Sequence, residues 1–128
     1  MKKVLALLLI LAVIFTPLHA QTKRNTTAEK TESRIIDTIA ALKEVKEREK
    51  YVLDQTKGKR HLQYTVWEKP SKDSPYYWIK VMEDNGNSYY THFNFYVYPK
   101  TMTIKYLDEI TDEAIDLKEW RKHNSNHQ

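Results

Sequence analysis

Hydrophobic residues recur at helical spacing in the segment RIIDTIAALKEV, residues 34–45. Its apolar side chains fall on one stripe, formed by Ile35, Ile36, Ile39, Leu42 and Val45. This period predicts an amphipathic helix over the segment, with Ser33 or Thr31 as the N-cap. The following residues, 46–57, fit two interpretations, because the helix could continue through them or give way to an extended segment.

Beyond Gly58 the pattern changes to the alternation that is typical of half-buried strands. Four segments show it: RHLQYTVWE (60–68), YYWIKVME (76–83), SYYTHFNFYVY (88–98) and TMTIKYL (101–107). The first separator, KPSKDSP, contains two prolines and predicts a loop, whereas DNGN and PK are short hairpin signals. The order of strands and short turns therefore predicts an antiparallel meander.

Side-chain parity in the long third segment predicts which face of this sheet is buried. Phe93, Phe95 and Val97 share one parity. A three-residue loop over 85–87, with a left-handed residue at Gly86 or Asn87, would set Phe93 opposite Ile79, whereas a two-residue turn would bury a lysine. A turn of two or four residues around Pro99 and Lys100 would keep the apolar residues of the fourth segment on this core face; these are Met102, Ile104 and Tyr106.

These elements predict an α+β fold, in which the N-terminal helix packs on one face of a curved four-stranded antiparallel meander. The C-terminal segment TDEAIDLKEWRKH carries Ile115, Leu117 and Trp120, and we expect it to form a short strand and a helical turn that dock at one end. We predict a single domain over 33–122, preceded by a flexible polar leader over 21–32 and followed by a disordered tail over 123–128.

The opposite parity defines an outer face that is rich in aromatic and hydrogen-bonding side chains. Tyrosine and tryptophan give a large rigid contact area together with a polar tip, which favours them at recognition surfaces. The candidate binding residues are Trp67, Tyr76, Trp78, Lys80, Tyr90, His92, Asn94, Tyr96 and Tyr98. Two other interpretations stay open: these side chains shield a solvent-facing sheet, or the C-terminal segment or a second copy covers them.

The N-terminus has the layout of a secretory signal peptide. Lys2 and Lys3 precede an apolar run from Val4 to Phe15, and a small residue, Ala20, ends the segment. The run is shorter than the roughly 20 residues that span a bilayer. We therefore expect export with cleavage after Ala20, a periplasmic or secreted product, and no membrane span after cleavage.

Charge and cysteine content narrow the range of partners. The formal net charge is +4, and cleavage would remove Lys2 and Lys3 and so lower it to +2. An exported chain of such mixed charge has little electrostatic reason to bind nucleic acid, so we expect no nucleic-acid partner. There is no cysteine, which excludes a disulfide framework and a lipid anchor attached through a thioether.

No catalytic constellation is visible in the sequence. It lacks a GxSxG elbow, a glycine-rich phosphate loop and a cysteine nucleophile. His123 and His127 have metal-ligand spacing but stand on the expected tail, and we interpret His61 and His92 as surface hydrogen-bonding residues. We therefore expect no enzyme activity, no cofactor and no metal.

Short phrases along the chain resemble small exported bacterial proteins with a PepSY-like or cystatin-like core. They are KEV at the end of the first helix, KP after the first strand, and then YYWIKVMEDNG, THFNFYVYPKT, IKYLDE and LKEWRK. The resemblance covers Ile35 to Lys122. The turn at 99–102 departs from PepSY-type domains, which carry an aspartate and a Thr-Gly pair there. The resemblance implies a non-enzymatic role in the cell envelope, including inhibition or regulation of other envelope proteins, and it brings no catalytic residues.

Three functions remain as hypotheses. The first is a non-catalytic binding module whose outer face recognises an envelope or extracellular protein, a peptide or a glycan. The second is an immunity or inhibitor protein that neutralises an exported toxin or hydrolase. The third is a structural homodimer that uses the same face.

Overall fold

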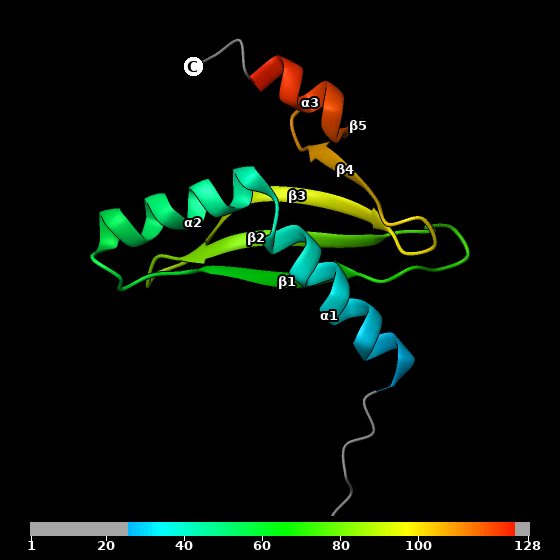
Figure 1. Cartoon of the computed structure of the whole chain (residues 1–128), viewed down its shortest axis with the longest axis horizontal. Helices are drawn as coiled ribbons and strands as arrows, with labels where there is room; N and C mark the ends of the chain where they lie inside the picture. The colour runs from blue at the N-terminus through cyan, green and yellow to red at the C-terminus, as the bar shows by residue number, and fades with distance from the viewer. Residues whose placement is uncertain (1–25, 125–128) are drawn as a thin grey trace, which may run out of the picture.

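The computed structural model describes residues 26–124, and the predicted signal peptide lies outside them. In chain order the elements are α1 (Thr27–Ala40), α2 (Lys43–Thr56), β1 (Leu62–Glu68), β2 (Tyr77–Asp84), β3 (Tyr89–Tyr98), β4 (Thr103–Asp108), β5 (Glu113–Asp116) and α3 (Leu117–Asn124). Two helices thus precede the sheet and a third follows it (Figure 1). None of these helices is long and apolar enough to cross a membrane.

Helix α1 begins earlier than the hydrophobic stripe predicts. Its N-cap is Thr26, whose hydroxyl accepts from the Glu29 amide, while the Glu29 carboxylate accepts from the Thr26 amide. This reciprocal capping box satisfies two of the free amides at the helix start. The prediction of a flexible leader is therefore wrong for residues 26–32, as is the expected N-cap at Ser33 or Thr31. Residues 21–25 lie outside the described part of the chain.

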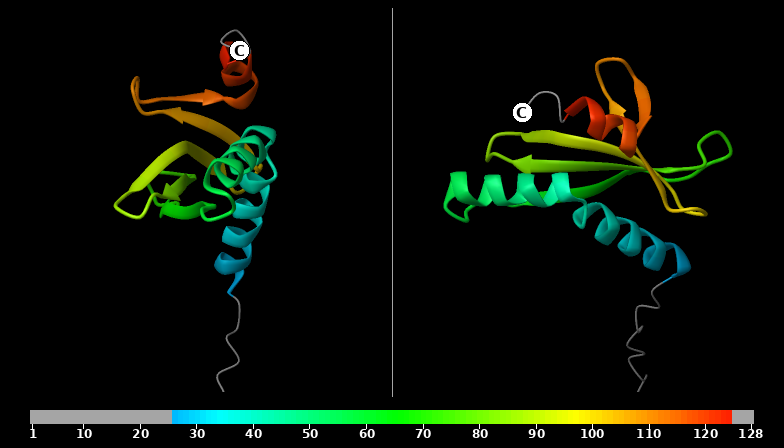
Figure 2. Two further views of the ribbon diagram at one scale, coloured as in Figure 1. Left: turned by 90° about the vertical axis from the view of Figure 1, so that its left-hand side faces the viewer. Right: turned by 45° about the horizontal axis from the view of Figure 1, so that its top comes forward.

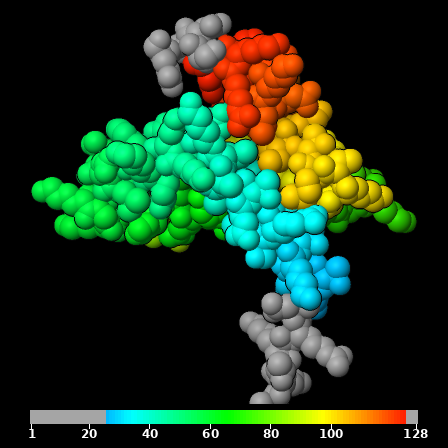
Figure 3. Space-filling model, in the orientation of Figure 1, coloured from blue at the N-terminus to red at the C-terminus, as the bar shows by residue number. Residues whose placement is uncertain are grey.

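Residues 46–57, which fitted two interpretations, are helical as far as Thr56. They belong to a second helix, α2, and do not continue α1. The chain is extended at Leu42, with φ −61° and ψ 137°, so α1 ends and α2 starts in a new direction. Each helix buries its own pair of residues, Ile35 and Ile39 in α1 and Val45 and Val52 in α2. Both pairs pack on the same face of the sheet, and Figure 3 shows the two helices along one side of the molecule.

The sheet is an antiparallel meander of five strands in the order β1-β2-β3-β4-β5. The sheet has one strand more than the four expected. The additional strand, β5, pairs with β4 from Lys105↔Asp116 to Asp108↔Glu113. Helix α3 follows directly, so the strand and helical turn expected for the C-terminal segment are present. His123 belongs to this helix rather than to a disordered tail, and residues 125–128 lie outside the described part.

The register between β2 and β3 differs from the predicted one. The loop has four residues, 85–88, and it places Phe93 opposite Val81 rather than Ile79. Gly86 has the expected positive φ of 91°, and Asn85 Oδ1 accepts hydrogen bonds from the amides at 87 and 88. A β-bulge at His92 inserts one extra residue between the two halves of β3. The longer loop and the bulge each shift the pairing by one residue. The total shift is two residues, so Phe93 stays on the predicted core face.

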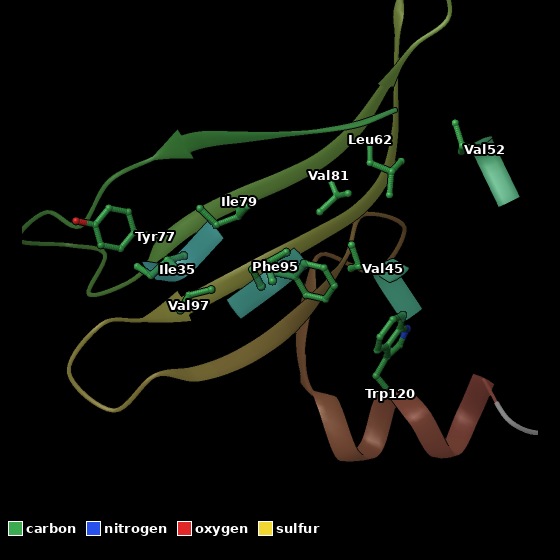
Figure 4. Close-up of a cluster of buried hydrophobic side chains, with 11 residues drawn as sticks. Ile35, Val45, Val52, Leu62, Tyr77, Ile79, Val81, Phe95, Val97 and Trp120 are labelled. Carbon is green, nitrogen blue, oxygen red and sulfur yellow. The ribbon is translucent and has the colours of Figure 1, made fainter. Parts of the chain in front are cut away.

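The core lies between the helices and one face of the sheet (Figure 4). It contains the predicted residues of β2 and β3, with Ile79, Val81, Phe95 and Val97 fully buried. The β3–β4 turn has four residues, so Ile104 lies opposite Val97 and on the core face, as predicted. Trp120 of α3 stacks on Tyr106 at 4.4 Å between ring centroids and meets the edge of Phe95 at 6.1 Å. This tryptophan therefore fixes α3 to the same core.

Candidate binding face

The outer face of the sheet is left uncovered by the described part of the chain. Helices α1 and α2 lie on the opposite side of the sheet (Figure 2), and Trp120 of α3 packs into the core on that side as well. The interpretation in which the C-terminal segment covers the outer face is therefore wrong for residues up to 124. Trp67, at 57% exposure, is the most exposed tryptophan side chain of this face.

Five aromatic side chains from three strands and the residue before β2 make one continuous aromatic cluster on this face: Trp67, Tyr76, Trp78, Tyr96 and Tyr98. Tyr76 stacks on Tyr96 with 3.9 Å between ring centroids and meets the edge of Tyr98 at 5.5 Å. Trp78 makes edge contacts with Tyr96 at 5.9 Å and with Trp67 at 6.3 Å. Such contacts hold the rings in fixed orientations, so the cluster presents a preformed surface.

A buried polar pair supports the middle of the aromatic cluster. Trp78 Nε1–H donates to Asn94 Oδ1 at 2.8 Å, and Asn94 is only 4% exposed. Burial, followed by hydrogen bonding and charge coupling with Tyr76, raises the pKa of Tyr96 far above its ordinary value. The Tyr96 phenol therefore stays protonated in neutral solution and can donate a hydrogen bond.

Two lysines lie against the rings. Lys80 Nζ is 3.9 Å from the ring centroid of Trp67 and 5.0 Å from that of Trp78, which is cation–π distance. Lys105 Nζ lies 6.0 Å from the ring centroid of Tyr98 and 3.8 Å from a carboxylate oxygen of Asp116. The two ammonium groups thus differ, because only Lys105 is close to a carboxylate.

One end of the outer face is hollowed into a groove of about 480 Å³, here called the outer groove. Its walls come from β1, β2 and β3, and its lining residues are Gln63, Thr65, Trp67, Lys80, Met82, Tyr89 and Thr91. The lining combines one ammonium group with neutral hydroxyl and amide groups and contains no carboxylate. A concave site with apolar walls and a few polar groups is the usual form of a small-ligand site.

Two candidate residues, Tyr90 and His92, are not on the outer face. Register places Tyr90 opposite Glu83, which pairs on its other side with the buried Leu62. His92 Nε2 lies 2.9 Å from Glu83 Oε2, and the rings of Tyr90 and His92 meet edge to face at 4.8 Å. The bulge turns both side chains to the helix side of the sheet, which no parity rule could predict.

The same bulge brings Tyr89 and Thr91 to the outer groove, where sequence parity had not placed them. Thr91 lies opposite Met82 instead of Val81. The remaining seven candidates are on the outer face, which confirms their positions and leaves their role as a prediction.

Glu83 is the centre of a polar group on the helix side. It accepts from His92 and also lies 3.4 Å from an Arg60 guanidinium nitrogen, whose other nitrogen donates to the Asn85 carbonyl at 3.0 Å. The hydrogen bond with His92, and less strongly the one with Arg60, lower the pKa of Glu83. This arrangement ties the β2–β3 hairpin to Arg60, two residues before β1 begins, so we interpret it as structural.

A second groove, of about 540 Å³, lies between α2, β3 and α3. It is lined by Glu44, Glu47, Arg48, Tyr51, Phe93, Trp120 and Asn124. Glu44 accepts two hydrogen bonds from the Arg121 guanidinium, the second at 3.1 Å, and this pairing lowers the pKa of Glu44. Sequence reasoning missed this groove because the conformation of residues 46–57 was open and Tyr51 had no assigned face.

Within residues 26–124, no three histidine, aspartate or glutamate side chains gather in a way that could hold a metal ion. His61 Nδ1 lies 3.1 Å from Glu49 Oε1 at an exposed position, and neither residue lines a groove. The side chains that line the two grooves offer aromatic stacking, hydrogen bonding and charge pairing.

Comparisons of the chain with protein-family models, with curated proteins and with solved structures find no match.

Proposed function

We propose that the protein is a non-catalytic binding module, exported through cleavage after Ala20, that recognises an envelope or extracellular protein, peptide or glycan through its outer face. One observation carries this proposal: a fixed cluster of five aromatic rings on a sheet face that no described element covers. Trp67 is exposed and the other four rings are half-buried. Aromatic area that stays accessible in one continuous patch marks an interaction site. The resemblance to small exported proteins with a PepSY-like or cystatin-like core supports the same role.

Trp67 is the best residue with which to test this function. It is more than half exposed, whereas Trp78 carries the bond to Asn94 and its removal would disturb the fold. We would probe arrays of glycans and of peptides with the protein and with Trp67→Ala. We expect at least a tenfold loss of signal for the bound class, because an exposed tryptophan at a recognition surface supplies much of the binding energy.

Tyr51→Ala is the matched control, because Tyr51 is 55% exposed and lies on the opposite side of the molecule. It should leave the array signal unchanged. Equal losses in both variants, or no loss with Trp67→Ala, would contradict the proposal. A dimer in sedimentation that Trp67→Ala dissociates would instead assign the outer face to a second copy.

A further inference from the structure

The outer groove places a positive charge where no protein carboxylate neutralises it. Lys80 is half-buried and projects between the rings of Trp67 and Trp78. Among the described residues no acidic side chain comes within 4.0 Å of its ammonium group, whereas Lys69, for example, lies 2.6 Å from Glu32. Partial burial strengthens the attraction of such an ammonium group for an anion.

Two acidic residues flank the outer groove without lining it. Asp84 pairs with Tyr89 at the end of the groove, and its Oδ1 accepts from the Gly86 amide at 2.8 Å inside the hairpin. Glu68 follows Trp67 and lies opposite Trp78 on the outer face, but it does not line the groove and forms no ion pair with Lys80. The groove therefore complements a ligand that carries a negative charge.

The neutral groups of the outer groove restrict the ligand further. Hydroxyl and amide groups of Gln63, Thr65, Tyr89 and Thr91 can both donate and accept hydrogen bonds. Peptides bind commonly through main-chain hydrogen bonds to a sheet edge. The outer groove lies on the face of the sheet, where the backbones of β1, β2 and β3 pair with one another. Free main-chain groups lie at the strand edges rather than on this face, so the groove itself offers a peptide few backbone partners.

A saccharide needs only side-chain partners. Its ring has an apolar C–H face that stacks on an aromatic ring and a rim of hydroxyl groups. We infer that the outer groove binds an acidic saccharide, whose carboxylate pairs with Lys80 and whose ring packs beside it against the part of Trp67 that Lys80 leaves uncovered. This inference rests on the proposed function and names the class of ligand for the same face.

Nuclear magnetic resonance of the three tryptophan indole N–H groups gives a direct test. Trp67 and Trp78 are on the outer face, whereas Trp120 lies in the core and serves as an internal reference. Two pairs of probes would be titrated: trigalacturonate against its methyl ester, and sialyllactose against lactose. We expect at least one acid to shift the two outer signals saturably and the Trp120 signal little, with at least tenfold weaker binding for its neutral counterpart.

Lys80→Met and Lys105→Met form a matched pair of variants, because both lysines lie on aromatic rings and only Lys105 is near a carboxylate. Lys80→Met should weaken binding of the acid at least tenfold, and Lys105→Met less than twofold. Equal effects of the two variants, equal binding of acid and neutral probe, or no shift with either acid would overturn the inference. So would tighter binding of hexaglutamate than of both acidic sugars.

Failure of this inference can be told apart from failure of the proposed function. If the arrays find a neutral glycan or a peptide whose binding depends on Trp67, the proposed binding function is supported and the inference of an acidic saccharide is contradicted. If the binding of no ligand depends on Trp67, both the proposed function and this inference are contradicted.

Discussion

The indole N–H of Trp78 and the side-chain oxygen of Asn94 form a buried hydrogen bond of 2.8 Å beneath the aromatic cluster. The two residues belong to neighbouring strands, since Trp78 lies opposite Tyr96 and Asn94 opposite Lys80. A buried amide without its partner keeps its desolvation cost. This bond therefore links the stability of the sheet to the shape of the outer face.

Asn94→Leu should lower the free energy of unfolding by about 1–3 kcal/mol, because the Trp78 N–H loses its acceptor. Urea denaturation followed by circular dichroism would measure it. Trp78→Phe is the partner variant, and it should cost less in the Asn94→Leu background than in the original protein. Strictly additive losses would show that the bond contributes nothing to stability.

Trp120→Ala should destabilise the protein by about 3–5 kcal/mol, since a buried aromatic residue leaves a large cavity. Its ring contacts Phe93, Phe95 and Tyr106, so its loss removes the main apolar contact of α3. Hydrogen exchange should then rise first in β5 and α3. Trp120→Phe keeps a ring in place and should cost clearly less; a similar loss in both variants would argue against docking through this side chain.

Glu83 should contribute to the pH dependence of stability. Its pKa in the folded protein is lowered from the ordinary value of 4.5, chiefly by the hydrogen bond with His92. Because the folded-state pKa is the lower one, the stabilisation is present above the unfolded-state pKa and is lost as the pH falls through the folded-state pKa. Glu83→Gln should therefore be less stable than the original protein at pH 6, with the difference shrinking below pH 4.5.

Thermal denaturation at a series of pH values would check this prediction. Asp84→Asn is the control, because Asp84 is the next residue of the same strand and is exposed. A difference between Glu83→Gln and the original protein that stayed constant from pH 7 to pH 3 would assign the effect to packing rather than to charge.

Thr26→Ala should cost about 1 kcal/mol, because it removes the capping hydroxyl of α1. The loss should appear as faster amide exchange in residues 27–31, whereas the sheet should keep its protection. Thr27→Ala, one residue further along and exposed, should have a smaller effect. If the two substitutions acted alike, helix propensity rather than capping would explain the result.

Sequence pattern predicted the buried half of this protein better than the rest. Ile35, Ile39, Phe95 and Val97 are buried as expected, because periodicity reports which side chains leave water. The first turns of α1 escaped because residues 26–30 are exposed and show no apolar period. Their signal was the capping box, Thr26 with Glu29, which the sequence does contain.

The outer face was harder to predict, for a different reason. A bulge adds one residue without changing composition or turn signals, and it reverses the face of each residue on one side of it. Thr91 and Tyr89 therefore line the outer groove, whereas Tyr90 and His92 are not on the outer face for which they were predicted. The cluster of Trp78 and Tyr96 lies beyond the bulge, so its face followed from parity alone.

Strand β1 also has a bulge: its pairing with β2 shifts between Val66 and Glu68, at the exposed Trp67. Strand β1 is one edge of an open sheet, and a regular edge strand invites lateral addition of strands from other molecules. The bulge interrupts the edge two residues before Lys69 and Pro70, neither of which suits continued pairing. The other edge, β5, has only four residues. The β1 bulge at the exposed Trp67 ring thus also protects the molecule against edge-to-edge aggregation.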